Sequence, residues 1–144
     1  MGSSVMRWLL SLVVVVSVLL GASNAVAAVH FKRIEYNPPG RDRTHLDDEV
    51  VVIKNTGDSA VRMRNWELDD RAGYDFTFPY FHLRAGEVVR VHSGSSYGDG
   101  PRDVYWHSPF PLWNNHGDTA FLFDDHGNGV DRCSYRGGDE VAIC

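Results

Sequence analysis

The chain has 144 residues, of which 19 are acidic and 14 are basic, for a formal net charge of −5. This length indicates one domain, and a hydrophobic content of 43% excludes a polytopic membrane protein and a disordered chain. The acidic balance argues against a general nucleic-acid binder, because such proteins cluster Lys and Arg to displace counterions from phosphates.

The first 27 residues are predicted to be a signal peptide. The apolar run Trp8–Leu20 is shorter than the roughly 20 residues that span a bilayer. A tail of small residues follows, in which Ala25 and Ala27 fit the −3 and −1 positions of a signal-peptidase site. We expect cleavage after Ala27, although Ala25 and Ala28 also fit as the last residue removed, and an uncleaved anchor is the alternative. The protein is therefore expected to be secreted, with cell-surface association as an option.

Residues 28–144 are predicted to form a single all-β domain. No stretch keeps a helical period, and short β-rich runs alternate with turn residues, as in an antiparallel β-sandwich. The expected strands are 29–36, 49–55, 61–68, 74–78, 87–92, 103–107, 119–124 and 129–135. The run 49–55 carries consecutive apolar residues, which suits a central strand covered on both faces. The Ser- and Gly-rich stretch 93–102 is predicted to be a surface loop.

Cys133 and Cys144 both lie in this domain. An even pair in an exported chain indicates a disulfide, which would close a loop of about a dozen residues and stabilise the fold by roughly 3 kcal/mol. Two free thiols are the alternative. A metal site made of the two cysteines is disfavoured, because the chain has no Cys-x-x-Cys spacing.

Several stretches that cover nearly the whole domain carry a shared pattern. In chain order they are Ile34–Gly40 (IEYNPPG), Glu49–Gly57 (EVVVIKNTG), Val61–Asp70 (VRMRNWELDD), Leu83–Gly94 (LRAGEVVRVHSG), Trp113–Leu122 (WNNHGDTAFL), and the closing residues Val130, Asp131, Ser134 and Tyr135. Together they resemble the lamin tail domain, in the form of a secreted, stand-alone protein of bacterial type. The chain departs from that family at Asn65, where the family often has Gly, and at the cysteine pair.

The resemblance implies an immunoglobulin-like antiparallel β-sandwich and a binding or scaffolding module without catalytic residues or a cofactor. Lamin tails contact DNA and proteins, but this acidic chain lacks the basic surface that DNA contact needs. The partner is therefore expected to be a protein or a cell-wall polysaccharide. Within the pattern, Trp66 and Trp113 are expected in the core, and Asn55 and Asp118 are expected to bond backbone groups in turns.

A cluster of aromatic residues between positions 97 and 113 is the candidate ligand or partner surface. Prolines stiffen this path, and aromatic rings in a rigid frame suit a sugar or a protein partner. The candidate contact residues are Tyr97, Tyr105, Trp106 and Phe110. The alternative is that these rings cap the end of the sandwich core.

Acidic residues offer a possible calcium site, as in a calcium-stabilised domain at the cell wall. The candidate ligands are Asp69, Asp70, Asp124 and Asp125, because Ca²⁺ prefers carboxylate oxygens. The stretch 124–129 begins like an EF-hand loop. However, Tyr135 stands where a bidentate Glu is needed, so a hairpin turn is the simpler interpretation.

The alternative from another functional class is a small metal-dependent hydrolase of nuclease type. It would use His116, Asp118, Asp125 and His126, since metal-assisted phosphodiester cleavage relies on such side chains. This hypothesis requires the four residues on one side of the fold, within reach of one metal ion.

Overall fold

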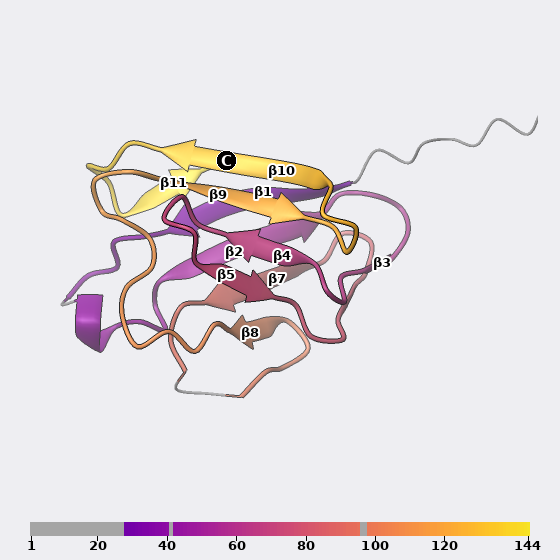
Figure 1. The fold of residues 1–144 in the computed structure, drawn as a ribbon, viewed down its shortest axis with the longest axis horizontal. Helices are drawn as coiled ribbons and strands as arrows, with labels where there is room; N and C mark the ends of the chain where they lie inside the picture. The colour runs from indigo at the N-terminus through magenta and orange to yellow at the C-terminus, as the bar shows by residue number, and fades with distance from the viewer. Residues whose placement is uncertain (1–27, 41, 96–97) are drawn as a thin grey trace, which may run out of the picture.

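The computed structural model describes residues 28–40, 42–95 and 98–144, which form a sandwich of two β-sheets (Figure 1). The strands are β1 (Val29–Glu35), β2 (Val50–Asn55), β3 (Val61–Arg62), β4 (Glu67–Asp69), β5 (Asp75–Thr77), β6 (His82–Leu83), β7 (Val88–His92), β8 (Asp103–Tyr105), β9 (Asp118–Phe123), β10 (Gly129–Tyr135) and β11 (Val141–Ile143). A single turn of 3₁₀ helix, Asp42–Thr44, lies between β1 and β2. The predicted all-β, immunoglobulin-like fold is confirmed.

One sheet has the strand order β11-β1-β2-β7-β8 and the other has the order β10-β9-β4-β5, while β3 and β6 pair separately. All pairs are antiparallel except β7 and β8, which run parallel. Parallel neighbours in one sheet need a connection that returns the chain to the end at which the first strand began. The strand β2 lies in the middle of its sheet, as its apolar run predicted.

The predicted strand 61–68 is interrupted in the structure. Asn65 adopts a left-handed backbone conformation with φ of 62°, and the amide of Trp66 donates to the carbonyl of Met63 at 3.0 Å. The resulting turn separates β3 from β4, so that the chain passes from the small β3–β6 pair to the four-stranded sheet.

The core lies between the inner faces of the two sheets. Alternate residues of β2 and β9 contribute to it, so that Val51 and Ile53 of β2 belong to the same core cluster as Ala120 and Leu122 of β9. Trp113 is 1% exposed and Trp66 is 6% exposed, which confirms their predicted core positions.

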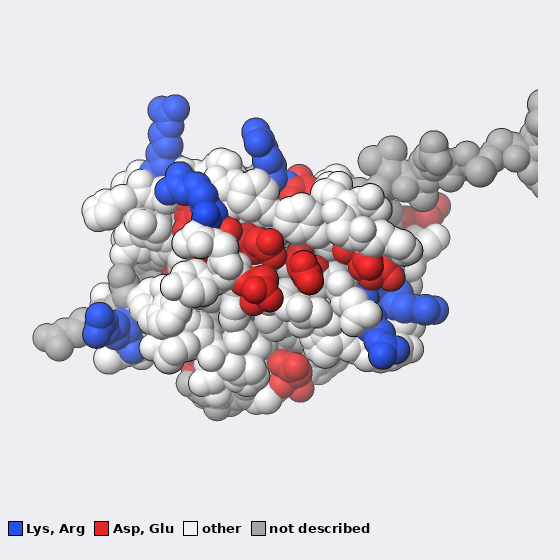
Figure 2. All heavy atoms as spheres, viewed as in Figure 1, with Lys and Arg blue, Asp and Glu red and all other residues white. Residues whose placement is uncertain are grey.

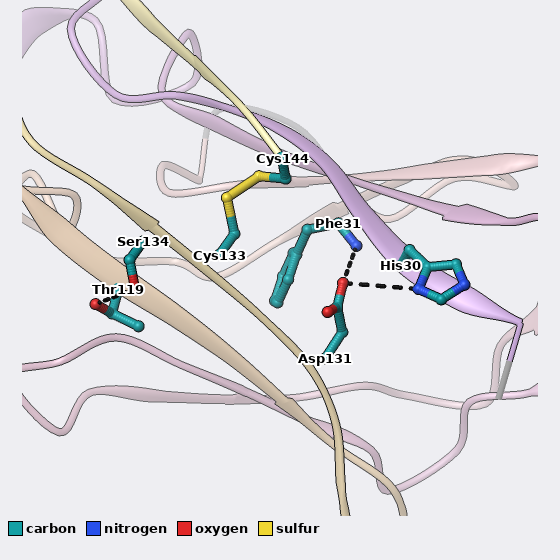
Figure 3. Close-up of a disulfide and its surroundings, with 7 residues drawn as sticks. All are labelled: His30, Phe31, Thr119, Asp131, Cys133, Ser134 and Cys144. Atoms are coloured by element: carbon teal, nitrogen blue, oxygen red, sulfur yellow. Dashed lines mark hydrogen bonds and ion pairs between the residues drawn. A yellow bond between two sulfur atoms is a disulfide. The ribbon is translucent and has the colours of Figure 1, made fainter. Parts of the chain in front are cut away.

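A disulfide joins the two sheets along one side (Figure 3). Cys133 of β10 is bonded to Cys144, which directly follows β11, so the predicted pairing is confirmed. On the same side, the carboxylate of Asp131 accepts a hydrogen bond of 2.8 Å from the amide of Phe31 in β1. These links connect β10 to the edge of the five-stranded sheet.

The described part of the chain has no helix that is long and apolar enough to cross a membrane. The predicted signal peptide lies outside the described residues.

Candidate binding surface

The segment 106–117 connects β8 to β9, and a buried carboxylate holds it in place. Glu49, which is 3% exposed, precedes β2. Its Oε1 accepts from the amide of Trp113 at 2.7 Å, and its Oε2 accepts from the amide of Leu112 at 3.0 Å. Both oxygens thus satisfy backbone donors of the segment, which fixes its path over the end of the sandwich.

A second buried carboxylate ties the same segment to the β4–β5 turn. Asp118 is 4% exposed. Its Oδ1 accepts from the amides of Thr119 at 2.7 Å and Arg71 at 3.2 Å, and its Oδ2 accepts from the amide of Asn114 at 3.2 Å. The predicted turn-bonding role of Asp118 is therefore confirmed, and Asn55 likewise accepts from the amide of Gly57 at 2.9 Å.

Tyr135 of β10 adds a third restraint. Its hydroxyl donates to the carbonyl of Asn114 at 3.0 Å, and its ring stacks on Tyr36 at a centroid distance of 4.1 Å. Burial, together with the negative charges of Asp118 and Glu49, raises the pKa of this hydroxyl. The group therefore stays protonated and keeps donating.

The restrained segment carries one ring of an aromatic pair that is exposed to solvent. Phe110 is 39% exposed and Tyr74, from the β4–β5 turn, is 47% exposed. Their rings meet edge to face with centroids 5.2 Å apart. The hydroxyl of Ser108 accepts from the amide of Phe110 at 3.2 Å and donates to its carbonyl at 2.6 Å, which orients the residue. We call these two rings the Tyr74–Phe110 surface.

The other predicted aromatic contact residues lie elsewhere. Tyr105 is 8% exposed and stacks on His92, with ring centroids 4.7 Å apart, on the outer face of the five-stranded sheet. Trp106 is half-buried and packs against Phe76 and Trp113, and Tyr97 lies outside the described residues. The structure thus does not bring the four together, and the accessible ring among those described is Phe110.

Tyr74 is not among the contact residues predicted from the sequence. The sequence does indicate that its ring is exposed, because an aromatic residue directly after the turn glycine Gly73 lies where a side chain is often exposed. Its contact with Phe110, however, depends on how two distant loops pack.

The four candidate calcium ligands lie in two places. Asp69 and Asp70 are at the end of β4, and Asp124 and Asp125 are in the β9–β10 turn. Asp69 pairs with Phe121, three residues before Asp124, so the two groups lie at different ends of the β4–β9 pair.

Asp124 and its neighbours form a hairpin turn. The carboxylate of Asp124 accepts from the amides of His126 and Asn128, each at 2.9 Å, and from the side-chain amide of Asn128 at 2.9 Å. These bonds, with the side chain of Asn128 first, lower the pKa of Asp124. Ligand atoms of Asp124, Asp125 and His126 lie within 4.8 Å of one another. A metal ion would compete with these turn bonds, and calcium binding stays a prediction.

Asp69 and Asp70 carry carboxylates whose ionised form is disfavoured. Burial raises the pKa of Asp69, and the nearby charges of Glu67, Asp75 and Asp70 raise it further. The pKa of Asp70 is also raised, with burial again the largest cause. Asp70 accepts from the amide of Tyr74 at 2.8 Å through Oδ1, whereas its buried Oδ2 has no hydrogen-bond partner among the described residues.

The four residues of the hydrolase hypothesis are also separated. His116 and Asp118 lie at the start of β9, whereas Asp125 and His126 lie beyond its end. At about 3.3 Å per residue, an extended strand of this length holds the two groups roughly 20 Å apart. They do not share one metal.

Comparison with known proteins identifies the family. The family model named Lamin Tail Domain matches residues 22–137, whereas no curated protein matches the chain. The matched residues include β1 to β10, while β11 and Cys144 lie beyond them. Such domains are immunoglobulin-like and generally non-enzymatic. The chain belongs to the lamin tail domain family.

Proposed function

We propose that this lamin tail domain is an exported, non-catalytic binding module, and that the Tyr74–Phe110 surface holds a partner protein outside the cell. The observation that carries the proposal is the pair of exposed rings on a segment that buried carboxylates fix in place. A contact surface fixed before binding loses little conformational entropy when the partner arrives. Exposed aromatic rings are also typical anchors of protein interfaces.

The use of the buried carboxylates supports a binding role over a hydrolytic one. Both oxygens of Glu49 and of Asp118 accept from backbone amides, so these groups are committed to holding loops. The residues of the hydrolase alternative lie at opposite ends of β9. The disulfide, which is typical of exported proteins, supports placement outside the cell.

Export and surface binding are tested in the same cells. The full chain is produced in its own host, and the culture fluid and cell surface are probed for a protein that lacks the leader. A photo-reactive amino acid is then placed at Phe110, with the exposed Thr77 position on β5 as the matched control. We expect a discrete cross-linked protein at Phe110 only, and its loss when Tyr74→Ser is added. Retention of the protein inside the cell, or equal cross-linking at both positions, would contradict the proposal.

A further inference from the structure

A groove of about 650 Å³ lies between β6 and the segment that precedes β8. Its lining includes Tyr80, His82 and Arg84 on one side, and Pro101 and Arg102 on the other. The Tyr74–Phe110 surface has no residue in it. We call it the Tyr80 groove.

The strand period exposes one row of side chains on this groove. Tyr80, His82 and Arg84 are exposed, whereas the intervening Phe81 and Leu83 are 7% and 1% exposed. Alternate residues of an extended segment point to the same side, so the three side chains form a continuous strip. Buried neighbours anchor the backbone beneath it, and the amide of Met63 donates to the carbonyl of Phe81 at 2.9 Å.

Tyr80 offers an accessible aromatic face. It is 70% exposed, more than Tyr74 or Phe110, and the centroid of its ring lies 5.1 Å from the centroid of the His82 ring. A tyrosine this exposed at the mouth of a groove contributes little to the core. A flat, partly apolar ring of a ligand can stack on it.

Two guanidinium groups and one carboxylate line the groove, so its lining has a positive balance although the chain as a whole has a net charge of −5. Arg84 and Arg102 line it, and Arg62 of β3 lies directly opposite His82 in the β3–β6 pair. Glu87 is the acidic residue of the lining, and its Oε1 accepts from Arg102 at 2.9 Å. Within the described residues, the guanidinium of Arg84 has no ion-pair partner.

We propose that the Tyr80 groove binds a carboxylate-bearing polysaccharide. Tyr80 stacks on the apolar face of one sugar ring, and the guanidinium of Arg84 donates two parallel hydrogen bonds to the carboxylate of that ring or the next. Arg62, which lies opposite His82 beside the groove, favours a further carboxylate along the ligand chain.

An acidic face lies beside this groove and restricts an anionic ligand to the groove itself. Glu67, Asp69 and Asp75 lie on the outer face of the neighbouring sheet, and Figure 2 shows acidic side chains over the middle of that face, with Lys and Arg near its margins. This acidic face would repel any polyanion that leaves the groove, so the contacts that hold the ligand lie within the groove. There a sugar acid offers both groups that the lining can use, an apolar ring face for Tyr80 and a planar carboxylate for the guanidinium of Arg84.

The proposal is tested by titrating the purified protein with a defined oligomer of galacturonic acid at low ionic strength and measuring the heat of binding by calorimetry. We expect Tyr80→Ala and Arg84→Ala each to weaken binding about tenfold or more, and Arg84→Lys to bind with intermediate affinity. Arg136→Ala, which removes an exposed arginine after β10, is the matched control and should bind as the unchanged protein does. Thermal unfolding of each variant verifies that the fold is intact.

The proposal is overturned if the oligomer does not bind, if its neutral methyl ester binds equally well, or if single-stranded oligodeoxythymidine binds more tightly. This test is separate from that of the proposed function, because Phe110→Ser should leave oligomer binding unchanged. Loss of oligomer binding in Phe110→Ser but not in Tyr80→Ala would assign the sugar to the Tyr74–Phe110 surface and overturn the assignment to the groove.

Discussion

A single side chain, Glu49, fixes a segment more than 60 residues further along the chain. We predict that Glu49→Gln lowers the free energy of unfolding by about 2 kcal/mol, because the amide NH₂ would face a backbone N–H that now donates to an oxygen. Urea unfolding at neutral pH measures this change. Glu140→Gln is the control, since the bonds of Glu140 to Tyr36 and Asn37 use its backbone carbonyl. Equal stability of the two variants would show that the Glu49 carboxylate does not hold the segment.

Asp69 and Asp75 face each other across the β4–β5 pair, and the pKa of Asp69 is raised from 3.8 by burial and by its acidic neighbours. The folded protein therefore holds this proton more tightly than the unfolded chain. Ionisation of Asp69 consequently destabilises the fold at neutral pH, and the effect disappears as the pH falls below 3.8.

We predict that Asp69→Asn stabilises the protein at pH 7 by about 0.5 kcal/mol, since like charges directly opposite each other repel. The gain should vanish as the pH falls below 3.8, and it should shrink when Asp75→Asn is already present. Thermal unfolding across this pH range provides the measurement. Destabilisation by Asp69→Asn at pH 7, reproduced in unchanged protein by EDTA, would instead favour the calcium hypothesis at Asp69 and Asp70.

The strand β11 depends on the disulfide at its end. It is three residues long, pairs with β1 at the edge of the sheet, and Ile143 is 81% exposed. The closed loop spans a sequence separation of 11, for which the chain-entropy relation gives about 3 kcal/mol. We predict a loss of about that size in Cys133→Ala/Cys144→Ala, measured by urea unfolding.

Hydrogen exchange separates the local effect from the global one. The amides of β11 should exchange much faster in the double variant. The exchange rates of the β2 amides, in the centre of the sheet, should change only as much as the global free energy of unfolding predicts. The unchanged protein under reducing conditions is the matched control and should behave like the variant. Equal protection of β11 in both proteins would show that pairing with β1 alone holds the strand.

The parallel pairing of β8 with β7 carries an acid-sensitive ion pair. Arg90 of β7 donates to Asp103 of β8 through Nε at 2.6 Å and through Nη2 at 2.8 Å. These bonds, helped by a 2.9 Å contact from His92, lower the pKa of Asp103 from 3.8 to about 2. A depressed carboxyl pKa stabilises the fold above pH 3.8, and that contribution is lost as the pH falls to about 2.

We predict that the unchanged protein loses stability between pH 4 and pH 2 more steeply than Asp103→Asn, which lacks this titration. Urea unfolding at a series of pH values in this window measures the slope. Asp99→Asn is unsuitable as a control because its carboxylate accepts from the amide of Tyr105, whereas Asp139→Asn changes an exposed side chain and should keep the slope. Parallel curves for the unchanged protein and Asp103→Asn would contradict the assignment.

Local patterns predicted the strands whose side chains alternate or are uniformly apolar, such as β2 and β7. They missed the break at Asn65, where the family often has Gly and where the backbone φ is 62°. Asn tolerates this conformation but also adopts ordinary ones, so its presence alone does not predict a turn. They also missed the parallel direction of β8 and the pairing of β11. These features depend on contacts between segments far apart in the sequence. For the same reason, Phe110 could be proposed as an accessible ring from the sequence, but its packing against Tyr74 could not.

At the scale of the whole molecule, the two proposed surfaces are separated by β5. Tyr74 precedes this strand and Tyr80 follows it, while Glu67, Asp69 and Asp75 lie on the outer face between them. The acidic middle of this face (Figure 2) would repel an anionic chain outside the groove. One domain could therefore hold a protein and an anionic polysaccharide at the same time, without competition between them.

The first residue of the folded domain bears on where the proposed signal peptide would be cleaved. The carbonyl of Ala28 accepts from the amide of Thr56 at 2.7 Å and from its hydroxyl at 2.9 Å. Cleavage after Ala27 leaves this carbonyl in place, whereas cleavage after Ala28 removes it and leaves two donors to water. Cleavage after Ala25 also keeps the carbonyl, but Ala25 and Ala27 are the small residues that fit the −3 and −1 positions for cleavage after Ala27. We therefore predict that protein recovered from outside the cell begins at Ala28, which its intact mass measures.

A protein that begins at Val29 is the informative comparison. It should be less stable by about 1 kcal/mol for the lost hydrogen bonds, which are partly exposed to solvent. Thr56→Val, which removes only the hydroxyl, should cause a smaller loss in the longer protein and almost none in the shorter one, because the acceptor is already gone. Equal effects of Thr56→Val in both proteins would show that Ala28 is not part of the folded domain, and the choice among the alanines would then depend on the peptidase alone.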